Sequence, residues 1–376
     1  MKIIIDDKIP YIRGAFESVA EVIYLPGSKT TPEVVKDADA IITRTRTGCN
    51  EKLLGGSTVK FIATATIGYD HIDSEYCDRA GIKWTNAPGC NSKSVEQYIA
   101  SALMVLAEKQ QVQLKDLCIG IVGVGNVGSK VATVCRILGM KVLLNDPPRE
   151  RAENSASFVT LDQIKDEADI ITLHVPLNLN GDDATFHLGN EPFFSSLKRK
   201  PFLINSCRGE VIETNAVKAA LKKEQLSGFV CDCWENEPDI DLELLALTEL
   251  ATPHIAGYSK DGKATGTRMT VHAVSDFFAL GLNNWLPEGV ELPTHPFIHL
   301  DGTGMNDQDI ISAAILSTYD IRFDDAQFRN NPSLFEQLRG DYPTRREYPA
   351  YTIIPLNIGS DVLDKIKKLG FKIKDN

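Results

Sequence analysis

The sequence lacks the features that mark several large classes of protein. None of its apolar runs approaches the ~20 residues that a membrane-spanning helix needs. Its first residues are a short apolar stretch followed by acids, unlike a signal peptide. The 40 Lys and Arg are outnumbered by 51 Asp and Glu, and a net charge of −11 disfavours nucleic-acid and anionic-membrane surfaces. We therefore expect a cytoplasmic protein without a nucleic-acid or membrane partner.

Cysteine pairs and metal-binding patterns are also missing. The eight cysteines include no C-x-x-C pair and most lie in apolar contexts, which favours reduced core thiols over a disulfide framework. His295 and His299 are four residues apart, but prolines flank them and disfavour a helix that would bring them together. No zinc pattern is present, so we predict that the protein has no metal site.

What is present is a long chain of globular composition. With 376 residues, of which 43% are hydrophobic, two or three domains are expected. Short apolar runs alternate with helical patterns, which predicts α/β domains built on parallel sheets. We expect a flavodoxin-like substrate (lid) domain at 1–95 plus 257–285, and a Rossmann-type doubly wound domain at 96–256. Prolines then mark a linker to a small C-terminal α+β domain at 286–376.

The expected elements follow this division. Strands are predicted at 2–5, 22–25, 40–43, 61–64, 83–84, 118–122, 141–145, 170–173, 202–205, 229–232 and 251–252, with long helices at 94–109 and 260–280. In the C-terminal zone we expect helices at 307–320 and 361–368 and strands at 351–355 and 369–373.

A glycine-rich loop gives the sharpest functional signal. Gly123, Gly125 and Gly128 follow the strand 118–122 in the pattern G-x-G-x-x-G, and a helix is expected directly after them. Such a loop turns tightly, lets the backbone approach a pyrophosphate, and points a helix N-terminus at the phosphates. Asp146, after the next strand, can accept the ribose hydroxyls of NAD and repel the extra phosphate of NADP. The motif alone also occurs as a plain turn, but the whole set predicts an NAD site.

Three candidate catalytic residues each follow a strand of the same domain. Arg208, Glu237 and His254 lie after the strands at 202–205, 229–232 and 251–252. Because the carboxyl ends of parallel strands face one crevice, these side chains can meet around one ligand. Histidine suits a general base, a carboxylate can orient it, and a guanidinium can hold a substrate carboxylate. Taken singly, each could instead be a packing residue, a loop acid or a surface charge.

The motifs together resemble the D-2-hydroxyacid dehydrogenase family over residues 1–280. Besides the glycine loop and Asp146, they are Leu173-His-Val-Pro-Leu, Ile204-Asn-Ser-Cys-Arg-Gly-Glu-Val-Ile, Asp232-Cys-Trp-Glu-Asn-Glu-Pro and Thr252-Pro-His-Ile-Ala-Gly. The resemblance implies an NAD-dependent oxidation of a 2-hydroxy acid in which Arg208, Glu237 and His254 are catalytic.

Further motifs are similar to one branch of that family, which acts on a small phosphorylated hydroxy acid and carries a C-terminal dimerisation domain. They are Asn86-Ala-Pro-Gly-Cys-Asn, Asn145-Asp-Pro-Pro-Arg, His254-Ile-Ala-Gly-Tyr-Ser, Tyr319-Asp-Ile-Arg-Phe-Asp-Asp and Thr344-Arg-Arg-Glu. The likeness implies a homodimer formed through residues 286–376. It also implies substrate contacts at Thr45, Thr66 and Tyr258, and NAD contacts at Asn126, Val127, Asp146, Val175, Ser206, Cys207, Arg208, Asp232 and Gly257.

A substrate with a carboxylate and a phosphate needs cations at both ends. Arg208 serves the carboxylate, and Arg44 and Arg46 are the candidates for the phosphate, with Arg345 and Arg346 as the next pair. The alternative for each is a solvated loop charge. For the whole protein, the alternatives are a relative that acts on phosphoglycerate or glycerate, and a non-catalytic scaffold that senses NAD.

Overall fold

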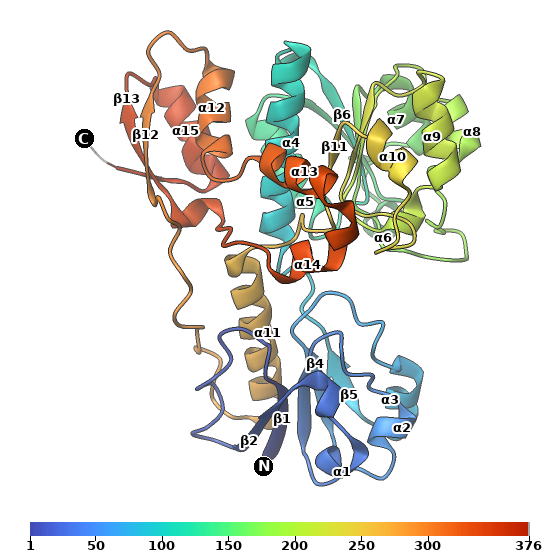
Figure 1. Ribbon diagram of the computed structural model, residues 1–376, viewed down its shortest axis with the longest axis vertical. Coiled ribbons are helices and arrows are strands. Elements are labelled where there is room, and N and C mark those ends of the chain that lie inside the picture. Colours follow the sequence, from blue (N-terminus) through green and yellow to red (C-terminus); the bar gives the residue numbers. More distant parts are fainter. Residues whose placement is uncertain (375–376) are drawn as a thin grey trace. The chain divides into compact units, whose positions relative to one another are not determined.

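The computed structural model describes residues 1–374, which form two compact units (Figure 1). Unit 1 contains Met1–Asn91 and Ser259–Glu291, and unit 2 contains Ser92–Tyr258 and Leu292–Asn376. Among the described residues, no helix is long and apolar enough to span a membrane.

Unit 1 is built on a five-stranded parallel sheet in the order β2-β1-β3-β4-β5, the flavodoxin-like order. Its strands are β1 (Lys2–Asp6), β2 (Glu21–Leu25), β3 (Ala40–Thr43), β4 (Phe61–Thr64) and β5 (Lys83–Thr85), and its helices are α1 (Pro32–Val35), α2 (Glu51–Leu54), α3 (Ser74–Ala80) and α11 (Lys260–Phe278). Side chains alternate along β1, so Ile3 packs with Val271 of α11 and Ile4 packs with the α1–α3 side. Both faces are therefore buried, which explains the unbroken apolar strand sequences.

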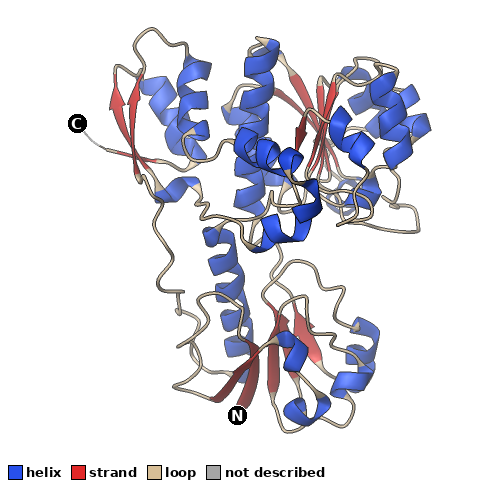
Figure 2. Ribbon diagram, viewed as in Figure 1, coloured by secondary structure: helices blue, strands red, loops and turns tan. Residues whose placement is uncertain are grey.

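Unit 2 contains a six-stranded parallel sheet in the order β11-β10-β9-β8-β6-β7 (Figure 2). Its strands are β6 (Cys118–Val122), β7 (Lys141–Asn145), β8 (Ile170–Leu173), β9 (Phe202–Asn205), β10 (Gly228–Cys231) and β11 (Leu250–Ala251). Its helices are α4 (Ser92–Gln110), α5 (Gly128–Ile137), α6 (Pro147–Glu153), α7 (Leu161–Glu167), α8 (Glu191–Ser195), α9 (Thr214–Lys222) and α10 (Leu242–Leu247). The strand order reverses at β6, and ligands of open α/β sheets bind at such a switch point.

The C-terminal part of unit 2 adds a three-stranded parallel sheet and four helices. They are β12 (Phe297–Asp301), β13 (Thr352–Leu356), β14 (Lys372–Ile373), α12 (Asp307–Leu316), α13 (Ile321–Asn330), α14 (Phe335–Gly340) and α15 (Ser360–Leu369). Short 3-10 helices complete the fold: η1 (Gly27–Lys29), η2 (Leu114–Asp116), η3 (Gly209–Val211), η4 (Pro332–Leu334) and η5 (Tyr348–Ala350). One hydrophobic core runs from α4 and α5 into α12 and α15. The division of the chain into three domains stays a prediction.

The strands of both larger sheets confirm the sequence prediction to within a residue or so, as do β13 and α15, but the other C-terminal elements do not. The predicted helix 307–320 ends at Leu316, and α13 and α14 occupy a stretch for which no structure was predicted. β12 was also missed, because prolines precede it and its outward face is polar or solvent-exposed. Most of the predicted strand 369–373 is wrong, since Leu369 ends α15 and Gly370 caps that helix with φ 112°.

Candidate active site

The three glycines of the loop between β6 and α5 have different tasks. A Cβ on Gly123, whose φ is 86°, would lie 2.7 Å from the carbonyl of His174, and one on Gly128 would lie 2.0 Å from the oxygen of Gly123. Gly125 has no atom within 4 Å of the corresponding position. Two glycines are therefore required by the fold itself, whereas Gly125 leaves room that a pyrophosphate can fill. Beside it, Asn126 is exposed and Val127 precedes α5 at its N-cap.

Asp146 lies directly against this loop. Its Oδ2 accepts the Val124 N–H at 2.8 Å, and its Oδ1 accepts the Arg149 N–H at 3.1 Å as the N-cap of α6. A carboxylate retains further lone pairs after two such bonds, so Asp146 can still accept ribose hydroxyls. The residues therefore fit the adenosine half of NAD.

Asp146→Ser should narrow the preference for NAD over NADP by roughly tenfold, because the like-charge repulsion between Asp146 and a 2′-phosphate is lost. Titration of each nucleotide, followed by protein fluorescence, measures this. Glu150→Gln, an exposed acid of α6, is the matched control and should leave the ratio unchanged. Tighter binding of NADP than of NAD by the unaltered protein would contradict the assignment.

The residues after β8 and β9 border the same site. Within residues 1–374 the buried Ser206 hydroxyl has no hydrogen-bond partner, which is the state of a group that a bound cofactor can satisfy. Cys207 is buried, its thiol lies 3.1 Å from Asn205 Oδ1, and burial raises its pKa to about 11. Val175 is the second residue of the loop after β8, and its N–H lies next to Gly123.

Glu237 and His254 form a hydrogen-bonded pair. Glu237 Oε2 lies 2.8 Å from His254 Nδ1, and Glu237 Oε1 accepts the Trp234 N–H at 2.8 Å. An ionised carboxylate only accepts hydrogen bonds, so Nδ1 of the imidazole donates and Nε2 is left free to take a proton. Both side chains are partly exposed, at 20% and 31%. This is the arrangement of a general base with its orienting carboxylate.

Arg208 lies on a loop that is joined to the Glu237 loop. The side-chain amide of Asn205 donates to the carbonyls of Arg208 at 2.9 Å and Cys233 at 3.3 Å. A Cβ on Gly209 would lie 2.0 Å from the carbonyl of Trp234, so the two loops touch backbone to backbone. Arg208 itself is half-buried and uses one donor on the Cys207 carbonyl at 2.7 Å, which leaves others for a ligand.

Comparison with known proteins agrees with this geometry. The family model "D-isomer specific 2-hydroxyacid dehydrogenase, NAD binding domain" matches residues 93–256, and a "Domain of unknown function (DUF3410)" matches residues 291–370. A protein of Bacteroides fragilis named erythronate-4-phosphate dehydrogenase is 54% identical over 94% of this chain and 99% of its own length. The chain belongs to the D-isomer specific 2-hydroxyacid dehydrogenase family. NAD is its cofactor.

More distant relatives extend the likeness. An erythronate-4-phosphate dehydrogenase of Shigella flexneri is 40% identical over 99% of this chain and 98% of its own. The solved D-lactate dehydrogenase of Aquifex aeolicus, complexed with NAD and lactic acid, superposes with a TM-score of 0.60 and 28% identity. It covers 76% of this chain and 97% of its own.

Asp232 holds the backbone next to the candidate catalytic residue His254 from one side. His254 has φ 55°, an uncommon left-handed conformation for a residue other than glycine. The Asp232 carboxylate accepts the N–H groups of Ile255 at 2.8 Å and Ala256 at 3.0 Å, and the Thr252 hydroxyl at 2.6 Å. Burial raises the pKa of Asp232, although these hydrogen bonds and His254 oppose the rise. A contact of the buried Asp232 carboxylate with NAD stays a prediction. A contact of the half-buried Gly257 with NAD also stays a prediction.

Arg345 holds the same backbone from the other side. Its Nη1 lies 3.3 Å from the Ala256 carbonyl, its Nε donates to Gln97 Oε1 at 2.9 Å, and the guanidinium lies 3.9 Å from the centre of the Tyr319 ring. The side chain is buried, and so is that of Arg346. The choice of Arg345 as a second candidate for the substrate phosphate is therefore corrected, because its donors bind groups inside the protein, whereas a phosphate contact of Arg346 stays a prediction.

Cys233 lies beside the Glu237–His254 pair. Its Sγ, a Glu237 oxygen and a His254 nitrogen are all within 4.8 Å of one another, close enough to hold a cation. Burial raises the pKa of this thiol well above its ordinary value, and the carboxylate and imidazole are already bonded to each other. The arrangement favours proton transfer over metal binding, and the absence of a metal site stays a prediction.

Glu237→Gln should move the acid-side fall of kcat/KM to lower pH. The carboxylate stabilises the protonated imidazole, so without it His254 releases its proton more readily and stays a free base at lower pH. A pH profile of kcat/KM measures this shift. Glu235→Gln is the control, since Glu235 belongs to the same loop but pairs with His187 at 2.7 Å. An unchanged profile in the Glu237 variant would refute its role.

The remaining predicted substrate residues form a separate group in unit 1. Arg44, Thr45 and Arg46 follow β3 and Thr66 follows β4, the neighbouring strand, so they lie at the same edge of that sheet. Arg44 Nε lies 3.4 Å from the buried Asp6 carboxylate, and Thr45 and Arg46 are exposed. The Thr66 hydroxyl donates to the Gly68 carbonyl at 2.9 Å. Their contact with substrate stays a prediction.

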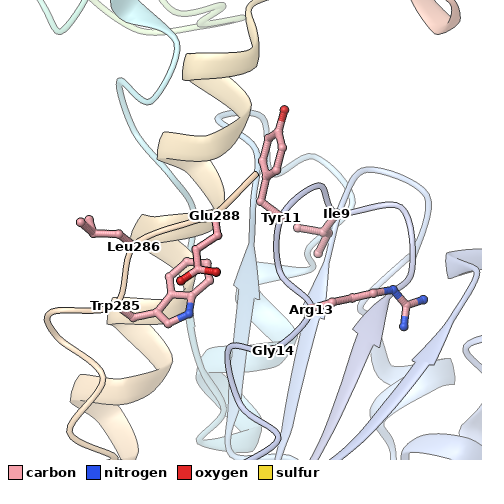
Figure 3. A pocket seen from close by; sticks show the side chains of 7 residues that line it. All are labelled: Ile9, Tyr11, Arg13, Gly14, Trp285, Leu286 and Glu288. Atoms are coloured by element: carbon pink, nitrogen blue, oxygen red, sulfur yellow. The ribbon is translucent and has the colours of Figure 1, made fainter. Parts of the chain in front are cut away.

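Unit 1 also contains a cavity of about 470 Å³, which Figure 3 shows between two segments of the chain. Ile9, Tyr11, Arg13 and Gly14 line it from the N-terminal loop, and Trp285, Leu286 and Glu288 line it from the segment after α11. None of the predicted site residues lines this cavity. We assign it no part in the reaction.

Proposed function

We propose that this chain oxidises 4-phospho-D-erythronate to (R)-3-hydroxy-2-oxo-4-phosphooxybutanoate with NAD, a step of vitamin B6 biosynthesis. The observation that carries the proposal is the Glu237–His254 pair next to the Arg208 loop, in a chain up to 54% identical to proteins named erythronate-4-phosphate dehydrogenase. The reduced-thiol cysteines and the NAD site support a cytoplasmic location.

The residues divide the work as follows. Arg208 holds the substrate carboxylate with its fork of donors, which fixes the neighbouring C2. His254 Nε2 takes the proton of the C2 hydroxyl, and the Glu237 carboxylate stabilises the imidazolium that forms. NAD, when bound, supplies the acceptor for the hydride that leaves C2. The proton on His254 then passes to solvent, and a C2 carbonyl remains.

Turnover with a panel of hydroxy acids tests the proposal. NADH formation, followed by its absorbance, should be fastest with 4-phosphoerythronate and much slower with erythronate, 3-phosphoglycerate and glycerate. A clear preference for phosphoglycerate or glycerate would favour another 2-hydroxyacid dehydrogenase. Tight NAD binding without turnover of any substrate would favour a non-catalytic scaffold.

We further propose that the chain forms a homodimer through its C-terminal sheet. The register of β12 and β13 places Phe297 and His299 on one face opposite Thr352 and Ile354, with Leu356 at its end. Phe297 and Leu356 are each more than half exposed, whereas Leu300 and Ile353 on the other face are buried. Two-fold association is the commonest way to cover such a face.

Phe297→Glu combined with Leu356→Glu should therefore shift the protein from dimer to monomer in light scattering, because charges would be buried at the interface. Phe323→Glu, at an exposed position of α13, is the matched control and should remain dimeric. A monomeric unaltered protein at micromolar concentration would contradict the proposal.

A further inference from the structure

Arg339 of α14 is a cation near Tyr258, in the loop that contains His254. Its guanidinium carbon lies 6.0 Å from the centre of the Tyr258 ring and 5.6 Å from that of Phe335. Tyr258 follows His254 by four residues along the same loop, so the C-terminal segment reaches the catalytic loop here. The sequence analysis assigned no role to Arg339.

The donors of Arg339 are not all used. Its Nε is buried and has no hydrogen-bond partner within residues 1–374. Its Nη1 donates to Glu336 Oε1 at 3.0 Å, in an exposed pair one helical turn apart whose contribution to stability is small. The side chain as a whole is 23% exposed. Arg339 therefore presents a partly desolvated charge with a donor left for a ligand.

The groups around Arg339 favour its protonated, positively charged form. Burial lowers the pKa of Arg339, but Tyr258, Glu336 and Glu237 outweigh it and raise the pKa above its ordinary value. Glu237 is the carboxylate of the catalytic pair, so the field of Arg339 extends to the reacting end of the site. The Tyr258 side chain is among the groups that raise the pKa of Arg339.

Three other arginines of the C-terminal segment already bind other groups. Arg345 holds the backbone behind His254. Arg329 pairs with Asp325 at 2.8 Å and donates to the carbonyl of Leu245, and Arg322 pairs with Asp320. Unlike Arg322, Arg329 and Arg345, Arg339 thus combines an Nε donor without a hydrogen-bond partner in residues 1–374 with a position near Tyr258.

We infer that Arg339, with the Tyr258 hydroxyl, binds the phosphate of the substrate and makes the C-terminal segment part of the active site. This inference rests on the proposed function. In a four-carbon substrate the phosphate is only a few bonds from the reacting carbon, so its cation has to lie near His254. A phosphate dianion close to Glu237 also needs a compensating positive charge, and a guanidinium binds phosphate with two parallel hydrogen bonds.

The test uses the full-length protein and inorganic phosphate as the probe. Phosphate binding to the NADH complex, followed by nucleotide fluorescence, should weaken about ten- to hundredfold in Arg339→Ala. KM for 4-phosphoerythronate should rise by a similar factor, while kcat/KM for unphosphorylated erythronate changes little. Arg339→Lys should recover part of the loss. Arg322→Ala, in the neighbouring α13, is the control and should behave as the unaltered protein.

Several results would overturn the inference. One is unchanged phosphate affinity in Arg339→Ala while Arg44→Ala or Arg46→Ala abolishes binding. Another is equal damage to erythronate and 4-phosphoerythronate in a variant that melts at the usual temperature, since Arg339 would then act on Glu237 alone. Weaker phosphate binding in Arg339→Ala supports the inference whether or not the Arg44 and Arg46 variants also lose affinity. Because the phosphate titration needs no turnover, it decides the role of Arg339 even if 4-phosphoerythronate proves to be the wrong substrate.

Discussion

His254→Ala should lower kcat about 10²–10⁴-fold, the usual cost of losing a general base. In the structure, Glu237 binds Nδ1 of this imidazole at 2.8 Å, which leaves Nε2 to accept the hydroxyl proton. His174 is not a comparable base, because burial lowers its pKa to about 3 and its ring lies 3.0 Å from the Thr172 hydroxyl. Single-turnover measurements with saturating 4-phosphoerythronate and NAD give the loss directly.

The control for His254→Ala is the affinity for NAD, which should remain unchanged because the glycine loop and Asp146 lie on other segments of unit 2. His187→Ala is a second control, since that ring pairs with Glu235. Turnover within tenfold of the unaltered enzyme would remove His254 from the role of base. Loss of NAD affinity together with turnover would indicate a damaged fold.

Arg208→Ala should lower kcat/KM about 10²–10⁴-fold through the loss of two charge-assisted hydrogen bonds to the substrate carboxylate, each contributing roughly 1.5–3 kcal/mol. The kcat/KM of Arg208→Lys should lie between those of the unaltered enzyme and of Arg208→Ala, because a point charge keeps the attraction to the carboxylate but not the two-pronged geometry. The backbone geometry of the loop should survive in both, since Asn205 binds the Arg208 carbonyl rather than its side chain.

Steady-state kinetics with 4-phosphoerythronate, compared with NAD titration, separates these effects. NAD affinity should change far less than kcat/KM. A Lys variant as active as the unaltered enzyme would show that the fork is not used, and an Ala variant that loses mainly NAD affinity would assign Arg208 to the cofactor instead.

Much of this architecture could be predicted from short stretches of sequence. The strands of the two larger sheets are runs of buried apolar residues, and a run such as Ile3–Ile5 is buried whatever lies across from it. Gly128 could be recognised because a side chain there would meet the Gly123 carbonyl within the same turn, and Gly123 because its φ of 86° disfavours other residues. His254, Glu237 and Arg208 were found because the carboxyl ends of parallel strands face the same edge of a sheet.

Other features lie beyond such local patterns. β12 and α13 each have a single buried face. The few core positions, such as Ile321 and Phe328 of α13, alternate with exposed residues and form no clear apolar run in the sequence. Nothing near Arg345 in sequence shows that it binds a carbonyl 89 residues away. Arg339 looked like any charge in a polar stretch until packing placed it over Tyr258.

The sequence by itself thus determined the strands, the glycine loop and the candidates for the catalytic residues, because these depend on neighbours along the chain and on the fixed geometry of a parallel sheet. The tertiary structure decided which groups hold the catalytic loop. The Asp232 carboxylate accepts hydrogen bonds from the N–H groups of residues 255 and 256, and Arg345 donates to the backbone carbonyl of residue 256. The tertiary structure also places Arg339 of the C-terminal segment near Tyr258, because the packing of a shared core sets the contacts between distant segments.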